Sequence, residues 1–454
     1  MSNAASATIA AGTFDAERFW RDPNASQLPF VPDKERAFIA GAMDELLFPF
    51  CGEGGTLLTR FGMHNAQHDY LRKLGFRFDA NHAPLASYAH HEDSPPSVFE
   101  LALAEEAREV IERMLPPGSK LNAYAVAPQL DRFVERYGLD AELPNNDVVR
   151  KVNSKIYSNH LYETLGLRPP GTVADSAEQL ARIGERMLSE GPFLIKDPYG
   201  VSGKGNMLVT SAPLLRRIVK HVDGQERSGR ATCFLMEPFL QKETDFSCQF
   251  TVGADGDWTL VSVQIMHNNG LAYLGSVTAD RDFMDRLEAL GYFEAMKRVG
   301  SQLAREGYYG SVCVDSMLLA GGQLVPIVEV NARQSMGLIN AGLDRHLAKR
   351  SLQGALTYLS VGYEHELDYA AWLEELERAE LLFVPEREYG VIPLSANAFC
   401  FASRIGAPSA AVTAGKLFKG RCYASIVASD PDERSRLMAR FRDHLQARRF
   451  TIYN

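Results

Sequence analysis

The stretch that decides the fold is Val328-Glu329-Val330-Asn331-Ala332-Arg333. Side chains along a β-strand alternate between its two faces, so Glu329, Asn331 and Arg333 share one face of the strand. The residues before them are apolar on both faces, which is typical of a buried strand. Polar side chains that end such a strand indicate either a binding site or a face of the sheet that meets solvent.

A second strand supplies another carboxylate. Residues 311–315 end in Asp315 and precede the turn at Gly321-Gly322, after which the chain returns to Glu329. Two carboxylates and the Asn331 amide oxygen suit a hard cation such as Mg²⁺, which also bridges nucleotide phosphates. The arginine that ends the strand can neutralise charge on a transferred phosphoryl group.

This hypothesis makes one geometric demand on the hairpin. A two-residue turn at Gly321-Gly322 would pair Asp315 with Val328 and point the carboxylate away from Glu329. A shared metal site therefore requires a three-residue turn or a β-bulge, and Pro326 is a credible marker of a bulge.

A glycine-rich segment follows an apolar strand earlier in the chain. The strand Phe193–Lys196 ends in a lysine, and a loop with Gly200, Gly203 and Gly205 comes next. Glycine lets backbone N–H groups approach phosphate oxygens without a Cβ clash, and lysine adds positive charge. The spacing fits neither the phosphate loop of P-loop enzymes nor the dinucleotide fingerprint. Alone, the segment is as compatible with a flexible hairpin as with phosphate binding.

Two further segments complete the pattern. A helix over 148–165 carries Lys151 and Lys155 off its apolar stripe and stops at Gly166. A strand over 234–240 runs into a loop whose backbone can bind the edge of an adenine ring, although a plain β-edge explains it as well.

In this order, the segments resemble the ATP-grasp superfamily. The resemblance rests on Lys155 ahead of a Gly-x-x-Pro turn, Lys196 with the glycine loop 200–205, a hinge glutamate at Glu237, and Asp315 followed by Glu-x-Asn-x-Arg at 329–333. The last motif is the most specific of these elements, and the glycine loop is the least specific.

The resemblance implies catalytic and metal-binding roles. Lys155 and Lys196 would hold the α- and β-phosphates of ATP, with Lys151 competing for the first position. Arg333 and Lys196 would be the catalytic residues, with Arg333 facing an acyl-phosphate. The residues that would bind two Mg²⁺ ions, or alternatively Mn²⁺, are Asp315, Glu329 and Asn331.

It also implies which residues bind the rest of the nucleotide. The glycine loop would cover the triphosphate with Gly200, Ser202, Gly203, Lys204 and Gly205. The hinge would hold adenine with Glu237, Pro238, Phe239 and Leu240. Asp245 would contact the ribose, at a point where many relatives carry Glu or His. An acceptor would lie near Arg333 and the loop 334–337, with candidates His267, Asn268 and Asn269 lining the same cavity.

The fold class that follows mixes α/β and α+β structure. Two α+β subdomains would clasp ATP in an ATP-grasp fold over 148–350, with a lid over about 167–235. A Rossmann-like pre-ATP-grasp domain would occupy 1–147, where strand and helix patterns alternate after an irregular start of 40 residues. A small mixed α/β region would follow over 351–454.

Other local patterns carry expectations of their own. A strand over 245–252 alternates apolar and polar residues, which predicts one buried face. The stretch 281–306 predicts a helix, so Glu294-Ala295-Met296-Lys297 within it is not a biotin attachment site. Asp430, Pro431 and Glu433 predict the start of the last helix.

Composition narrows the partners. The 454 residues carry a net charge of −9, which does not favour nucleic acid. No apolar run is long enough for a membrane span, and the six cysteines form no C-x-x-C pair, so we expect buried thiols in a cytoplasmic protein. His90-His91-Glu92-Asp93 is read as an exposed loop and not as a metal site. A homodimer is left open.

The expected activity is that of an ATP-dependent ligase. It would phosphorylate a carboxylate to an acyl-phosphate and couple that to an amine of an amino acid or small peptide, releasing ADP and phosphate. The alternatives are a carboxylase, a kinase that uses the same fold, and a nucleotide-binding protein without catalysis.

Overall fold

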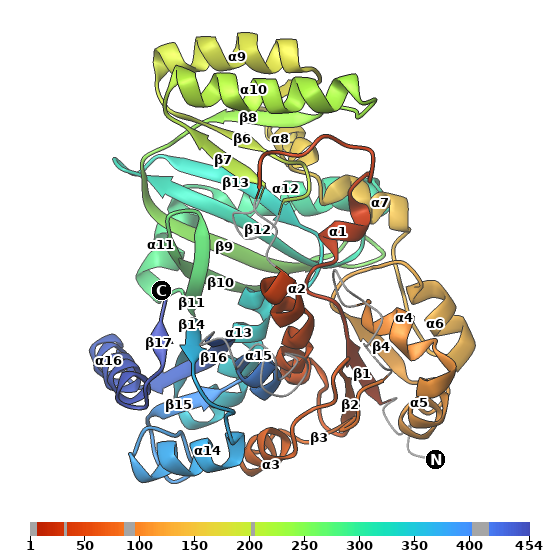
Figure 1. Cartoon of the computed structure of the whole chain (residues 1–454), viewed down its shortest axis with the longest axis vertical. Helices are drawn as coiled ribbons and strands as arrows, with labels where there is room; N and C mark the ends of the chain where they lie inside the picture. The colour runs from red at the N-terminus through yellow and green to blue at the C-terminus, as the bar shows by residue number, and fades with distance from the viewer. Residues whose placement is uncertain (1–6, 31–33, 86–95, 201–204, 402–416) are drawn as a thin grey trace.

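The computed structural model describes residues 7–30, 34–85, 96–200, 205–401 and 417–454. Its strands form one nine-stranded sheet and two four-stranded sheets. In Figure 1 the helices α9 and α10 lie at one end of the molecule, the largest sheet runs through the middle, and the N-terminal sheet lies at the other end. No helix in these ranges is both long and apolar enough to cross a membrane.

The N-terminal sheet is parallel, as the alternating strand and helix patterns predict. Its order is β3-β2-β1-β4, with strands β1 (Thr8–Ala11), β2 (Gly55–Leu58), β3 (Phe78–Ala80) and β4 (Lys120–Ala123). The expectation that residues 1–40 lack regular structure is wrong, because β1 is a central strand. Its four residues, Thr-Ile-Ala-Ala, are too few to show a periodic pattern.

Short helices surround this sheet. They are α1 (Glu17–Trp20), α2 (Lys34–Gly41), the 3₁₀ helix η1 (Ala42–Phe50), α3 (Asn65–Lys73), α4 (Val98–Ala102), η2 (Glu105–Ala107), α5 (Arg108–Met114) and α6 (Leu130–Tyr137). The last of these ends at Gly138, whose positive φ of 58° closes the helix in the left-handed conformation that glycine favours.

A second four-stranded sheet, here called the lid sheet, is antiparallel. Its order is β5-β8-β6-β7, with strands β5 (Thr172–Ala174), β6 (Phe193–Lys196), β7 (Asn206–Val209) and β8 (Phe234–Pro238). The helices α9 (Ala177–Glu190) and α10 (Ala212–Arg227) pack together and cover one of its faces (Figure 1). The opposite face is therefore free to line a cleft.

The largest sheet holds the acidic strands. Its order is β13-β12-β9-β10-β11-β14-β16-β15, and β17 pairs with β14. The strands are β9 (Lys242–Val252), β10 (Trp258–Asn269), β11 (Ala272–Thr278), β12 (Gly310–Leu319), β13 (Leu324–Asn331), β14 (Gln353–Tyr363), β15 (Gly390–Pro393), β16 (Phe418–Ala428) and β17 (Thr451–Ile452). Strand β14 joins β11, so the residues after 350 continue this sheet. The division into domains at 147 and 350 stays a prediction.

The remaining helices flank the large sheet. They are α7 (Asn146–Val152), α8 (Lys155–Thr164), α11 (Arg281–Ala289), α12 (Tyr292–Arg305), α13 (Met336–Leu347), η3 (Ala348–Arg350), α14 (Tyr369–Arg378), α15 (Ala396–Phe401) and α16 (Pro431–Ala447). The start of α16 is confirmed, since the Asp430 side chain accepts a 2.8 Å hydrogen bond from the Glu433 backbone N–H. Of the six cysteines, all but Cys233 are buried, and none is in a disulfide.

Two helices expected to be continuous are each split. The stretch 148–165 breaks because Asn153 turns its side chain to the Val149 and Ala332 backbones, with hydrogen bonds of 2.8 and 2.9 Å, and Ser154 starts a new helix as its cap. Lys155 is therefore the first residue of α8. The stretch 281–306 breaks at Gly291, whose φ is +71°.

The expectation of one buried face for the strand over 245–252 is also wrong. Phe246 and Phe250 are buried as expected, but Ser247 and Gln249 on the other face are at most 3% exposed. Helix α13 covers that second face so closely that a Cβ on Gly337 would lie 2.4 Å from the Gln249 side chain. Polar residues that alternate along a strand can face a polar interior as well as solvent.

Candidate active site

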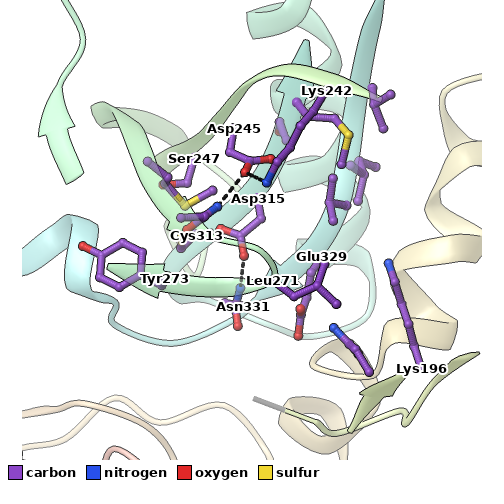
Figure 2. Close-up of a pocket in the computed structure, with 18 of the residues that line it drawn as sticks. Lys196, Lys242, Asp245, Ser247, Leu271, Tyr273, Cys313, Asp315, Glu329 and Asn331 are labelled. Carbon is purple, nitrogen blue, oxygen red and sulfur yellow. Dashed lines mark hydrogen bonds and ion pairs between the residues drawn. The ribbon is translucent and has the colours of Figure 1, made fainter. Parts of the chain in front are cut away.

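A cleft of roughly 510 Å³ opens between the lid sheet and the large sheet. Figure 2 shows its polar residues projecting from β9, β12 and β13 on one side and Lys196 entering from the lid sheet on the other. The cleft thus collects residues that are up to 175 positions apart in the chain, from Tyr162 to Gly337.

The hairpin of β12 and β13 meets the geometric demand stated above. Asp315 pairs directly with Glu329, and the register shifts between Asp315 and Met317. The turn is also longer than two residues, because the Leu319 N–H donates to the Gln323 carbonyl at 2.9 Å. The bulge lies at Pro326, whose carbonyl accepts a 2.8 Å hydrogen bond from the Ser316 hydroxyl. Both predicted devices are present, and both carboxylates face the cleft.

The polar side chains at this end of the hairpin form a chain of hydrogen bonds. The Asn331 amide donates to Asp315 Oδ2 at 3.3 Å, and Arg333 Nη2 donates to Asn331 Oδ1 at 3.1 Å. Burial, and then repulsion from Glu329, raises the pKa of Asp315 to about 7. A buried carboxylate held next to a second carboxylate is an environment that a cation stabilises.

These residues fit a magnesium ion. Asp315, Glu329 and Asn331 offer oxygen ligands from neighbouring strands, and the Asn331 oxygen keeps a second lone pair beside its bond from Arg333. No cluster of three His, Cys, Asp or Glu residues suited to a metal occurs in the described ranges. The segment His90-His91-Glu92-Asp93 lies outside those ranges, so its expected place in an exposed loop is not described.

The two candidate phosphate lysines are each paired with a glutamate. Lys155 is 2% exposed and donates to Glu329 Oε1 at 2.7 Å, and its ammonium also reaches the Gly200 carbonyl. Lys196 forms an ion pair with Glu237 across the lid sheet. Lys151 instead pairs with Glu306 at 2.5 Å, outside the cleft. The geometry therefore favours Lys155 over Lys151.

The glycine loop is described only at its two ends. Ser202, Gly203 and Lys204 lie outside the described residues, whereas Gly200 and Gly205 form the neck of the loop. Gly205 has a φ of +77°, and a Cβ there would lie 2.9 Å from the Asp197 Cβ and 3.0 Å from the Gly200 Cα. The neck is thus closed by contacts that only glycine permits.

The hinge residues border an apolar part of the cleft. Glu237, Phe239 and Leu240 line it, and Pro238 ends strand β8 beside them. Apolar or aromatic neighbours on the facing walls are Tyr162, Pro170, Leu194, Leu208, Met317 and Ile327. The Phe239 N–H already donates to the Pro192 carbonyl at 3.0 Å, so it is not free for a ligand. An apolar region of this kind suits an adenine ring.

Asp245 lies on the far side of the acidic residues from the lid sheet. It accepts a 2.6 Å hydrogen bond from the Asn268 amide, and it forms an ion pair with Lys242 (Figure 2). The predicted cavity residues His267 and Asn269 do not line the cleft, whereas Asn268 does. Sequence reasoning missed Lys242 and Tyr273, which also line the cleft. Strict alternation would place Lys242 on the face opposite Asp245, and the register shifts beside it, between Leu318 and Leu319.

Arg333 is held by residues of the N-terminal part of the chain. Its Nε donates to Glu17 Oε1 at 2.7 Å, and its Nη1 donates to the Tyr124 hydroxyl at 3.1 Å. Burial would lower the pKa of Arg333, but Glu17 and Tyr124 outweigh burial and raise it. Neither partner carries a sequence signal, because each lies more than 200 positions from Arg333. Of the loop that follows, Ser335, Met336 and Gly337 line the cleft, and Gln334 is buried against Asn122.

Comparisons with known proteins agree with this architecture. Over 215 residues the chain is 28% identical to the [butirosin acyl-carrier protein]–L-glutamate ligase of Niallia circulans. The aligned part is 46% of this chain and 50% of that protein. The chain therefore matches only about half the length of this curated relative. No protein-family model matches the sequence.

Two solved structures resemble nearly the whole chain. The biotin carboxylase domain of the Hydrogenobacter thermophilus 2-oxoglutarate carboxylase, solved with MgADP and bicarbonate, has a TM-score of 0.53 at 14% identity and covers 99% of this chain and 91% of its own. The phosphoribosylamine–glycine ligase of Thermotoga maritima has a TM-score of 0.51 at 15% identity and covers 98% of this chain and 97% of its own. At these identities the likeness concerns the fold. The chain therefore has the ATP-grasp fold that the sequence predicts.

Proposed function

We propose that the protein is an ATP-dependent ligase that phosphorylates a carboxylate to an acyl-phosphate and couples it to an amine. The observation that carries this proposal is that one cleft brings together Lys196, two carboxylates and an amide beside an apolar region, with Lys155 buried behind Glu329 and bonded to it. Phosphoryl transfer needs such positioning and neutralised charge, and it needs no protein nucleophile.

The residues divide the work as follows. Lys196, on the lid sheet, and Lys155, at the neck of the glycine loop, would exchange their glutamate partners for phosphate oxygens. A carboxylate oxygen of the substrate would attack the γ-phosphorus while the bond to the ADP oxygen breaks. The amine nitrogen would then attack the acyl carbon, lose a proton, and expel phosphate as the C–O bond breaks. The two lysines would neutralise the negative charge on the phosphate oxygens during both steps.

Magnesium fits the same account. Asp315, Glu329 and Asn331 are the residues that would hold it, and when bound it would neutralise charge on the phosphates. Because Asp315 and Glu329 face each other, a divalent cation between them would relieve their mutual repulsion. Whether one or two ions bind, and whether Mn²⁺ replaces Mg²⁺, is decided by titration of the purified protein with each metal.

We infer that one substrate is an amino acid. The name of the curated relative joins L-glutamate to an acyl-carrier protein. The polar end of the cleft, with Asp245 and Lys242 side by side and Asn268 next to them, offers both signs of charge. This proposal assigns Asp245 to the substrate and not to the ribose, the contact that the family resemblance implied. An amino acid, which carries an ammonium and a carboxylate, is complementary to such a pair.

The test is to identify the nucleotide product. The protein is incubated with Mg-ATP and a panel of L-amino acids, L-glutamate first, each paired with amines, other amino acids and an acyl-carrier protein. ADP and phosphate that appear only with one particular pair would support ligation and name the substrates. AMP and pyrophosphate would contradict the mechanism, since adenylation and not an acyl-phosphate would then activate the carboxylate.

Further arms of the same experiment separate the alternatives. Phosphate released only with bicarbonate would favour a carboxylase, and a stable phosphorylated product without phosphate release would favour a kinase. If no pair is turned over while ADP binds tightly, the protein is a nucleotide-binding protein without catalysis.

A further inference from the structure

The guanidinium of Arg333 is fully engaged by protein groups. Its Nε and Nη2 face Glu17 Oε1, and Nη2 also reaches Asn331. Its Nη1 donates to the Tyr124 hydroxyl at 3.1 Å and to the Gln334 carbonyl at 3.0 Å. These contacts account for all five N–H donors of an arginine. In this arrangement Arg333 orients its neighbours, and its charge is balanced by Glu17.

Glu17 has no other task visible in the structure. It is 5% exposed, and Arg333 is its only side-chain partner among the described residues, with Oε2 accepting no hydrogen bond there. A buried carboxylate that serves a single cation is costly to keep unless the pair is needed. The pair joins α1 to the end of β13, beside the candidate metal ligands.

The segment that carries Glu17 is anchored on both sides of the cleft. Trp20 donates its indole N–H to the Val126 carbonyl at 3.1 Å, which fixes α1 to the N-terminal sheet. Arg21 pairs with Asp197 at the neck of the glycine loop, and Leu28 packs in the hydrophobic core under the lid sheet. Glu17 is therefore held in place by a short stretch of chain that bridges two parts of the molecule.

We propose that Glu17 is a positioning residue of the active site. It fixes the Arg333 guanidinium, which in turn holds the Asn331 oxygen, and it cancels a positive charge next to the metal site. This inference rests on the proposed nucleotide-dependent function, and it assigns a role to a residue of the N-terminal part of the chain that the sequence motifs do not include.

The charge argument gives the sign of the effect. Asn331 links Arg333 to the metal site, since it accepts a hydrogen bond from Arg333 at 3.1 Å and donates one to Asp315 at 3.3 Å. Without Glu17, an unbalanced cation would stand beside the ion that Asp315 and Glu329 would bind. Like charges at such short range weaken cation binding, since the dielectric response of a buried site is low. Loss of Glu17 therefore raises the Mg²⁺ requirement.

The experiment measures ADP binding by calorimetry over a series of Mg²⁺ concentrations, so turnover is not needed. In Glu17→Gln, the Mg²⁺ concentration for half-maximal ADP binding rises by about fivefold or more. Glu17→Asp keeps the charge with a shorter reach and shows a smaller rise. In the Arg333→Gln background, adding Glu17→Gln changes the requirement by less than about twofold, because the two residues act through one contact.

Glu45→Gln is the matched control. Glu45 is also a buried carboxylate of the N-terminal part, and it accepts 2.8 Å hydrogen bonds from Ser395 and Asn397 far from the cleft. This change should lower the thermal midpoint as Glu17→Gln does and leave the Mg²⁺ requirement unchanged. A general loss of packing would therefore affect both variants alike, whereas positioning affects only Glu17→Gln.

The outcomes are distinct. If the wild-type protein binds ADP with Mg²⁺ and Glu17→Gln and Glu17→Asp need no more Mg²⁺ than it does, the positioning role is refuted and the proposed function stands. A lower Mg²⁺ requirement in Glu17→Gln would also refute it, since Glu17 would then compete with the ligand. If the wild-type protein binds no ADP at any Mg²⁺ concentration, the proposed function fails and this inference fails with it.

Discussion

At the scale of the residue, Glu329 is the carboxylate with the most to do in the cleft. It faces Asp315 across the hairpin and holds Lys155 at 2.7 Å. We predict that Glu329→Gln lowers ATP-dependent turnover by about a hundredfold or more, because the metal loses a charged ligand. Steady-state ADP release measures this loss.

The same variant should remain folded. Glutamine can still accept a hydrogen bond from Lys155, so we expect the free energy of unfolding to fall by about 1–3 kcal/mol, measured by denaturant titration. Glu306→Gln, which removes the partner of Lys151 outside the cleft, is the control and should keep its rate. Substantial turnover by Glu329→Gln would mean that Glu329 is not a metal ligand.

The two lysines of the adjoining helices provide a matched pair of variants. Lys155 is buried beside Glu329 and Gly200, whereas Lys151 is exposed and pairs with Glu306. Lys155→Met should weaken Mg-ADP binding by about tenfold or more, because a phosphate loses a charge-assisted donor. Lys151→Met should change it by less than about twofold. Equal effects in calorimetric titrations would reject Lys155 as the phosphate lysine.

At the scale of the element, the neck of the glycine loop is the most constrained turn. Gly205 needs its positive φ and also has Asp197 and Gly200 within 3.0 Å of any added Cβ. We predict that Gly205→Ala weakens ADP binding by about tenfold, because the neck must open to admit a methyl group. Gly229→Ala shares the positive φ, at +88°, but meets no atom within 4 Å.

Both glycine variants should cost about 1 kcal/mol of stability from backbone strain, measured by thermal unfolding. Only Gly205→Ala should also change ADP affinity. If Gly229→Ala weakens binding as much, the effect belongs to general strain in the lid sheet and not to the neck of the loop.

Elements also mark what the sequence could and could not predict. The sequence predicted that Glu329, Asn331 and Arg333 share one face and that a bulge could lie at Pro326, because alternation along a strand is local and strict. Strand β1 was missed, since four small and apolar residues carry no period. The break at Asn153 was missed because Asn153 is turned by the Ala332 backbone, which lies 179 positions away. The conformation of a side chain that hydrogen-bonds to a distant backbone group cannot be predicted from a local sequence pattern.

At the scale of the whole molecule, the active site is formed by segments that lie far apart in the sequence. The lid sheet supplies Lys196, the large sheet supplies the carboxylates, and Glu17 comes from the N-terminal part. Sequence motifs predicted the ATP-grasp fold and the residues within it, but not the contacts between Arg333 and Glu17 or Tyr124. Those depend on how separate layers dock, which no spacing along the chain records.

Because the cleft lies between two sheets, a bound nucleotide should contact both sheets and raise the free energy of unfolding. We predict that Mg-ADP at about one hundred times its dissociation constant stabilises the protein by about 2.7 kcal/mol and raises the thermal midpoint by several degrees. Differential scanning calorimetry with and without EDTA measures the metal-dependent part. The same midpoint with and without Mg-ADP would contradict binding across the cleft.

The central claim is that a carboxylate is activated as an acyl-phosphate. The most direct test uses the substrate pair found by ADP release, with both carboxylate oxygens of the donor labelled with ¹⁸O. Because the carboxylate oxygen attacks phosphorus and leaves with it, each released phosphate should carry one ¹⁸O atom, seen as an isotope shift in its ³¹P spectrum. Unlabelled phosphate alongside ADP and ligated product would show that no bond formed between the carboxylate and phosphorus, and would contradict the account.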